Sequence, residues 1–136
     1  MKTLTKIILS IAMFTVSHFA VAQIPPTLHS NEISYISGGV GEEETAAILA
    51  EAKQWPLLLE LSQIENGRGI WIFGAKIKIS NAKKQVIFDA QADGPYMLIN
   101  LSPGDYVIQA SYQGIEQSRA LSVKAGLPQK ITLFWK

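Results

Sequence analysis

The sequence predicts a mostly β protein: an antiparallel β-sandwich of about seven strands with one N-terminal amphipathic helix packed on it. Two observations indicate this fold. After Pro56, apolar side chains recur at every second position, and turn residues separate these alternating runs. Before Pro56, one segment has apolar residues at intervals of three and four, which is the period of a helix.

The first 22 residues have the pattern of a secretory signal peptide. Lys2 and Lys6 precede an apolar run, and Ala20-Val21-Ala22 fits the small-residue rule for cleavage before Gln23. The run, residues 7–19, is short for a spanning helix, which takes roughly 20 apolar residues. We therefore expect an exported, cleaved protein in the periplasm or outside the cell, with no stable membrane anchor after cleavage.

Charge and composition argue against several classes of function. Removal of Lys2 and Lys6 from the 12 basic side chains leaves them nearly balanced by the 11 acidic ones. That balance argues against nucleic acid as a partner, because phosphate contacts need clustered Lys and Arg. The chain has no cysteine, so it has neither a disulfide framework nor a thiolate metal site.

The segment after the predicted cleavage site begins without periodicity. Residues 23–32 contain two adjacent prolines, so we interpret them as an extended leader before a domain spanning residues 33–136. Residues 33–36 could form a short strand. In the predicted helix, which Pro56 ends, one face carries Ile48, Leu49, Ala52 and Trp55.

Four alternating runs place one set of side chains toward a core. The inward sets are Leu57, Leu59 and Leu61; Trp71, Phe73, Ala75, Ile77 and Ile79; Val86, Phe88, Ala90 and Ala92; and Ile131, Leu133 and Trp135. Ile70 and Ile72 are apolar on the face that should be wet, and a bulge at Gly74 or cover from the helix would explain both. Lys76 and Lys78 are expected on an outer strand face, where lysine discourages edge pairing.

Residues 36–45, ISGGVGEEET, are the first candidate for a ligand site. A phosphate loop usually has a Lys or Arg nearby, whereas Glu42, Glu43 and Glu44 would repel phosphate. A calcium loop needs oxygens at alternating positions along a longer segment. We therefore expect the glycines to form a tight strand-to-helix turn, and the acids to favour the positive end of the helix dipole.

Residues 93–114, DGPYMLINLSPGDYVIQASYQG, predict a β-hairpin. Pro103 and Gly104 suit the two central positions of a type II turn, and Leu101 would plug the end of the core. The inward side chains of this hairpin would be Tyr96, Leu98, Tyr106, Ile108, Ala110 and Tyr112. We expect the tyrosines to be core residues rather than binding residues.

The same segment resembles a known family. The matching residues are Gly94, Tyr96, Leu101, Pro103-Gly104, Tyr106 and Gly114, which are similar to the G-x-Y…L-x-PG-x-Y…G pattern of carboxypeptidase regulatory-like domains. That resemblance implies a transthyretin-like (prealbumin-like) β-sandwich of about seven strands. Upstream, SGGVGEEE followed by the helix is similar to a subgroup of small exported bacterial proteins. The resemblance covers roughly residues 33–124, and it implies a fold more than a function.

Activities of related families need residues that this chain lacks. Transthyretin-related hydrolases acting on hydroxyisourate need several histidines and a C-terminal tetrapeptide, whereas His29 is the only histidine after Gln23 and the chain ends LFWK. The Lys–Asn crosslink of Cna-type relatives needs an asparagine on the last strand, and QKITLFWK has none. The metallopeptidase activity of carboxypeptidases belongs to a separate catalytic domain.

General catalytic arrangements are also missing from the sequence pattern. With no cysteine and with His29 in the leader, no Ser-His or Cys-His pair is expected on the folded body. Asp89 and Asp93 would lie about 13 Å apart along a strand, too far apart to act on one bond, so we expect them to be solvated. We therefore expect no catalytic, cofactor-binding or metal-binding residues.

The function expected from the sequence is a non-enzymatic accessory or binding module that recognises another envelope protein or an extracellular ligand. Two alternatives stay open. One is a structural subunit or stabilising partner of a larger envelope assembly. The other is a hydrolase with an unrecognised site built from acids alone.

Overall fold

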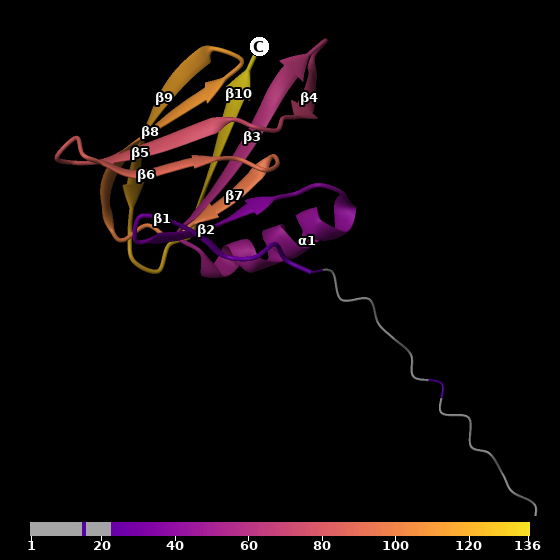
Figure 1. The fold of residues 1–136 in the computed structure, drawn as a ribbon, viewed down its shortest axis with the longest axis horizontal. Helices are drawn as coiled ribbons and strands as arrows, with labels where there is room; N and C mark the ends of the chain where they lie inside the picture. The colour runs from indigo at the N-terminus through magenta and orange to yellow at the C-terminus, as the bar shows by residue number, and fades with distance from the viewer. Residues whose placement is uncertain (1–14, 16–22) are drawn as a thin grey trace, which may run out of the picture.

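A computed structural model describes Thr15 and residues 23–136 (Figure 1). Apart from Thr15, the predicted signal peptide, residues 1–22, lies outside the described residues. In this part of the chain, no helix is long and apolar enough to cross a membrane. The elements are β1 (Leu28–Ser30), β2 (Ile33–Gly38), α1 (Glu42–Glu51), the 3₁₀ turn η1 (Ala52–Gln54), β3 (Leu57–Glu65), β4 (Arg68–Trp71), β5 (Lys76–Asn81), β6 (Val86–Gln91), β7 (Tyr96–Ile99), β8 (Gly104–Tyr112), β9 (Ile115–Val123) and β10 (Gln129–Trp135).

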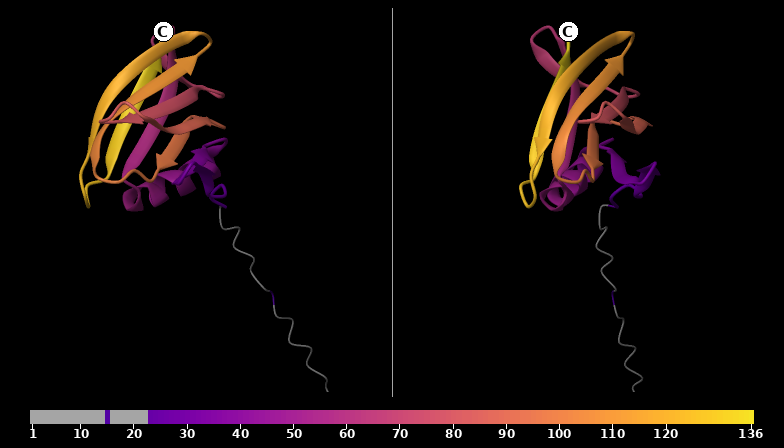
Figure 2. Two further views of the ribbon diagram at one scale, coloured as in Figure 1. Left: turned by 60° about the vertical axis from the view of Figure 1, so that its left-hand side comes forward. Right: turned by 90° about the vertical axis from the view of Figure 1, so that its left-hand side faces the viewer.

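The strands form two sheets that face each other as layers (Figure 2). The six-stranded sheet has the order β1-β2-β7-β3-β10, and β4 pairs with β3 beyond the end of β7. The four-stranded sheet has the order β6-β5-β8-β9. The predicted mostly β sandwich with one helix is therefore confirmed. The pairing is not wholly antiparallel, because β10 runs parallel to β3.

The main core lies between the two sheets and uses most of the predicted alternation. The fully buried side chains of these runs are Leu57, Leu59, Leu61, Ala75, Ile77, Ile79 and Phe88, and Ile131, Leu133 and Trp135 are also buried. Burial of one such large side chain stabilises the fold by about 1.5–3 kcal/mol. Val86 was expected inside but is exposed, and a register shift between Ile79 and Ser80 interrupts the β5–β6 ladder beside it.

A second, smaller core lies between α1 and the outer face of the six-stranded sheet. It contains Ile36, Ile48, Ala52, Leu58, Tyr96 and Leu98. Figure 1 shows α1 running along the side of the molecule formed by β2 and β7. Leu49 was expected on the buried face but is exposed. The helical region ends at Gln54, before Pro56, as predicted.

The predicted hairpin over residues 93–114 is wrong, because β7 and β8 belong to different sheets. All four side chains of β7 are buried. Met97 and Ile99 belong to the main core, whereas Tyr96 and Leu98 pack in the helix-side cluster. A strand buried on both faces is apolar at every position, so its sequence shows no alternation that would assign its faces.

The Pro103-Gly104 step connects the two sheets rather than closing a type II turn. Gly104 already starts β8 and has φ 157°, whereas a type II turn needs about +80° at this position. Leu101 is buried at the end of the core, as predicted. The Tyr106 hydroxyl donates a hydrogen bond of 2.6 Å to the carbonyl of Ser102 and ties the connection to β8.

The chain also changes sheets between β4 and β5. Ile72 is buried in the main core, whereas Trp71 and Phe73 are exposed, which is the reverse of the expected order. Gly74 has φ 83°, a left-handed conformation that favours glycine, and its amide donates to the carbonyl of Ala92. This irregular crossing replaces the single long strand that the alternation predicted.

The segment interpreted as a leader contains β1, which pairs with β2. The end of β1 and the turn after it cover the open edge of β6: the Ser30 hydroxyl donates to the carbonyl of Asp89 and accepts from its amide, at 3.0 and 2.9 Å. Asn31 donates to the carbonyl of Ile87 at 3.1 Å. On the opposite side, Gln117 of β9 donates to the carbonyl of Phe134 of β10 at 2.9 Å. Side chains thus form hydrogen bonds with backbone groups of two edge strands, β6 on one side of the sandwich and β10 on the other.

Lys76 and Lys78 are exposed on the outer face of β5, as expected. Their predicted role in discouraging edge pairing is wrong, because β5 lies between β6 and β8 and is not an edge strand.

Candidate functional site

The glycine-rich segment forms a strand-to-helix turn, as predicted. Gly41 is the N-cap of α1 with φ 88°, and Gly39 has φ 101°. Glu44 reaches back so that its Oε1 accepts from the amide of Gly39 at 2.8 Å and from that of Val40 at 3.4 Å. The buried Thr45 hydroxyl donates to the carbonyl of Gly39 at 3.0 Å. The turn is held by its own side chains, in the manner of a capping box.

Of the three glutamates, only Glu44 makes such contacts with other described residues, so we expect it to stabilise the fold most. Replacement Glu44→Ala should lower the free energy of unfolding by about 1.5 kcal/mol or more, because two amides lose a charged acceptor. The matched replacement Glu43→Ala, at an exposed position of the same turn, should cost less than about 0.5 kcal/mol. Urea unfolding of both variants measures the difference; equal losses would contradict the role of the Glu44 contacts.

The outer face of the six-stranded sheet carries a row of aromatic side chains beyond the region that α1 covers. Phe134 of β10 and Trp71 of β4 are both in register with Ser62 of β3, so the three side chains lie side by side on one face. Phe134 is 52% exposed and Trp71 is 44% exposed. We call Phe134, Ser62 and Trp71 the aromatic row.

The aromatic row has an apolar border on one side and a fixed ring on the other. Ile64, two residues along β3 on the same face, is 38% exposed. The ring of Tyr96 lies 6.3 Å from that of Trp71 in an edge-to-face arrangement, and Tyr96 itself packs against the helix side. The row therefore continues the helix-side core onto open surface, where no described residue covers it.

Ser62 occupies the centre of the aromatic row. Its side chain is buried at 4% exposure, and its hydroxyl has no hydrogen-bond partner among the described residues. An unsatisfied buried hydroxyl typically costs about 1–3 kcal/mol. The geometry of the sheet accounts for the burial, since larger side chains stand on both sides, but nothing in the fold explains the choice of a hydroxyl here.

A single ion pair lies next to the aromatic row in the described part of the chain. The ammonium group of Lys130 is 2.9 Å from the carboxylate of Glu60, the residue paired with Tyr96. The hydrogen bond to Glu60, together with its negative charge, raises the pKa of Lys130. Burial is the main cause that raises the pKa of Tyr96, and the charge of Glu60 adds to it. Near neutral pH, Lys130 therefore carries its positive charge and the Tyr96 hydroxyl is neutral.

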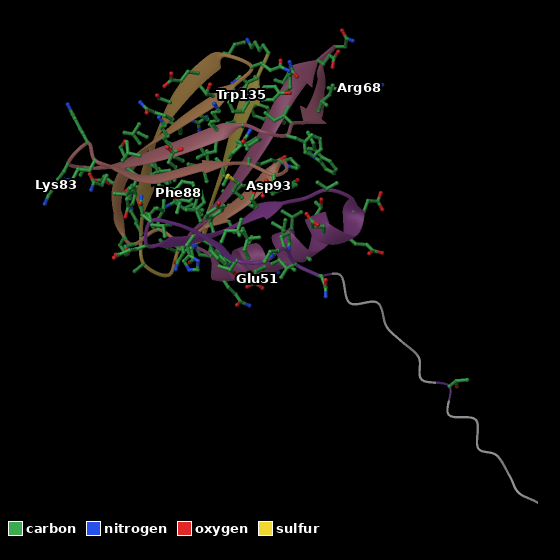
Figure 3. The ribbon with its side chains drawn as sticks, viewed as in Figure 1. Glu51, Arg68, Lys83, Phe88, Asp93 and Trp135 are labelled. Carbon is green, nitrogen blue, oxygen red and sulfur yellow. The ribbon has the colours of Figure 1, made fainter. Side chains whose placement is uncertain are left out.

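The sequence did not reveal the aromatic row. The alternation predicts that Trp71 faces inward, and no pattern singles out Phe134. The sequence does contain a signal, because residues 70–73, IWIF, are apolar at four successive positions. Successive side chains of a strand point to opposite faces, so in a sheet with one buried face every second apolar side chain of this run must be exposed. In Figure 3, Arg68 marks the tip of the β3–β4 hairpin that carries Trp71, far from Glu51 at the end of α1.

The acidic and histidine side chains singled out in the sequence do not come together. His29, Asp89 and Asp93 are exposed. The amide of Asp93 donates to the Ser37 hydroxyl at 2.7 Å, which is a structural contact. Among residues 23–136 and Thr15, no group of three or more His, Cys, Asp or Glu side chains is placed to hold a metal ion.

The architecture and the exposed row together describe a small β-sandwich with an uncovered aromatic surface on one sheet. Comparison with known proteins adds no further assignment: no protein-family model matches the chain, and no curated protein is significantly similar to it.

Proposed function

We propose that the chain is an exported, non-enzymatic binding module that recognises another protein of the cell envelope through the aromatic row. The observation that carries this proposal is the exposure of Trp71 and Phe134 on either side of Ser62, on one face of the sheet. Aromatic side chains, Trp above all, dominate the energetics of protein interfaces, and large exposed apolar patches on soluble domains often mark binding sites.

Export is part of the proposal and rests on the signal-peptide pattern of residues 1–22. The proposed fold type is the transthyretin-like sandwich of carboxypeptidase regulatory-like domains. The roles of the motif residues support this assignment: Leu101 closes the core and Tyr106 anchors the connection between the sheets.

The test is capture of a partner from the periplasm, with the aromatic row altered in a matched design. The wild-type protein should retain one specific protein, and the double variant Trp71→Ser/Phe134→Ser should lose it. The control Val107→Ser removes an apolar side chain of 40% exposure from β8, in the other sheet, and should keep the partner. Equal capture by the double variant would refute the proposed surface.

Two further readouts separate the alternatives. The intact mass of this protein recovered from the periplasm should correspond to a chain that begins at Gln23, and a chain retaining residues 1–22 would refute export. A complex of fixed stoichiometry that persists through gel filtration would assign the chain as a structural subunit of an envelope assembly. A transient complex would assign it as a recognition module.

A further inference from the structure

A cleft of about 470 Å³ lies at the end of the sandwich where β3 and β10 begin, whereas the aromatic row lies toward the other end of these strands. Three connections line the cleft: the residues before β3, those between β7 and β8, and those between β9 and β10. Its volume is in the range of sites for small organic ligands, about 300–1,000 Å³.

The charge of the cleft lining has one sign. Lys53 and Lys124 both line it, and no Asp or Glu does. The only ion pair in the described part of the chain joins Lys130 and Glu60, so neither cleft lysine has an intramolecular carboxylate partner. Two unpaired ammonium groups on the walls of one cleft are complementary to an anionic ligand.

The remaining polar groups come mainly from side chains. Gln54, Asn100 and Ser102 line the cleft. The side-chain amide of Asn100 donates to the Ser34 hydroxyl at 3.4 Å, and its side-chain carbonyl oxygen accepts no hydrogen bond from the described residues. Proline occurs in each of the three connections, and proline has no N–H to offer. A ligand here would bond to carboxamide, hydroxyl and ammonium groups more than to backbone amides.

The apolar part of the cleft includes an indole in a fixed orientation. Trp55 is half-buried, and its Nε1 donates to the Glu51 carboxylate at 3.4 Å. Leu127, which is 58% exposed, adds apolar surface, and the buried Leu101 closes the floor of the cleft toward the main core. An indole next to carboxamide and hydroxyl groups suits a ring that has an apolar face and polar edges.

We propose that this cleft binds the acidic sugar units of an anionic polysaccharide. The carboxylate of the sugar would bond to Lys53 and Lys124, its hydroxyls to the carboxamides and Ser102, and its ring would pack on Trp55. An extended acidic peptide fits less well, because the three prolines remove backbone donors that such a peptide would pair with. This site is separate from the aromatic row, and the proposal does not depend on the protein partner.

The experiment is a titration of the purified exported protein with a galacturonic acid trimer, followed by NMR shifts of backbone amides. We expect saturable shifts at residues 53–55, 100–102 and 124–127. A neutral glucose trimer of the same number of rings should bind at least about tenfold more weakly, because it cannot pair with the lysines. No saturable shift with the acidic trimer, or equal binding of the neutral one, would overturn the proposal.

Charge-neutral variants locate the site. Lys53→Gln/Lys124→Gln should weaken binding of the acidic trimer at least about tenfold, since it removes both charged donors. The matched control Lys76→Gln/Lys78→Gln removes two exposed lysines from β5 and should bind as the wild type does. Equal weakening in both variants would indicate general charge attraction and would overturn the site.

Two further titrations distinguish this proposal from an unspecific anion site and from binding at the aromatic row. Inorganic phosphate that shifts the same amides with the same affinity would indicate an unspecific anion site and would overturn the sugar assignment. The variant Trp71→Ser/Phe134→Ser should bind the acidic trimer as the wild type does. Failure of the partner capture and failure of the sugar titration are therefore distinguishable.

Discussion

Replacement Gly94→Ala should lower the free energy of unfolding by about 3 kcal/mol, the upper part of the range for overpacking. A Cβ at Gly94 would lie 2.6 Å from the carbonyl carbon of Gly38 and closer still to the carbonyl oxygen. These are backbone atoms at the end of β2, which is held by β7, so they cannot move aside cheaply. Thermal unfolding should show a decrease of roughly 10 °C.

The control for this result is Gly69→Ala in β4. A Cβ there would meet no atom within 4 Å, and the glycine does not have a positive φ. The same chemical change should therefore alter stability by less than about 0.5 kcal/mol. Equal losses in both variants would refute the close approach of Gly94 to β2 as the cause, because Gly→Ala alone reduces the freedom of the unfolded chain and does not destabilise the fold.

Replacement Phe88→Ala should cost about 3–5 kcal/mol, the range for a buried phenylalanine. Phe88 is fully buried between the sheets, and its ring meets Tyr35 edge-on, with the ring centres 5.1 Å apart. The deletion removes this contact and leaves a cavity that the two hydrogen-bonded sheets cannot close. The measurement is the denaturant midpoint, with an unchanged slope as the sign of a folded starting state.

Phe134→Ala is the matched control, since it removes the same side chain from the exposed aromatic row. We expect a loss below about 1 kcal/mol, because the ring is half in water in the folded protein. A small effect on stability together with loss of the captured partner would assign Phe134 to recognition. A loss as large as that of Phe88→Ala would show that the row belongs to the core of the fold.

The sequence predicted those parts of the fold in which one face of a strand is wet. On β5 and β10 the alternation assigned the buried side chains, and the helix before Pro56 was recognised by its period. On β3 it assigned the face toward the main core but not the burial of Leu58 and Ser62 on the other face. The alternation failed where a strand is buried on both faces or where the chain changes sheets. β7 is apolar throughout, so nothing in it signals that Tyr96 faces the helix and Met97 the main core. Because the strand is interrupted at Gly74, Trp71 lies on the outer face of the sheet rather than in the core.

The candidate sites could not be predicted, for a related reason. The aromatic row requires knowledge that β10, β3 and β4 are neighbours, and the parallel β10–β3 pairing joins residues about 70 positions apart. The cleft joins three connections, and only the fold brings Lys53 near Lys124. By contrast, the turn at Glu44 is local, and the sequence correctly predicted a turn that starts a helix.

The side-chain contacts along the strand edges bear on the behaviour of the protein at high concentration. A free strand edge can recruit strands from other copies, which is a first step toward fibrils. Here Ser30 and Asn31 already occupy backbone groups of β6, and Gln117 occupies one on β10. A copy that adds a strand to the edge of β6 must first break the bonds from Ser30 and Asn31. We expect aggregation through this edge to require that the β1–β2 turn first detach.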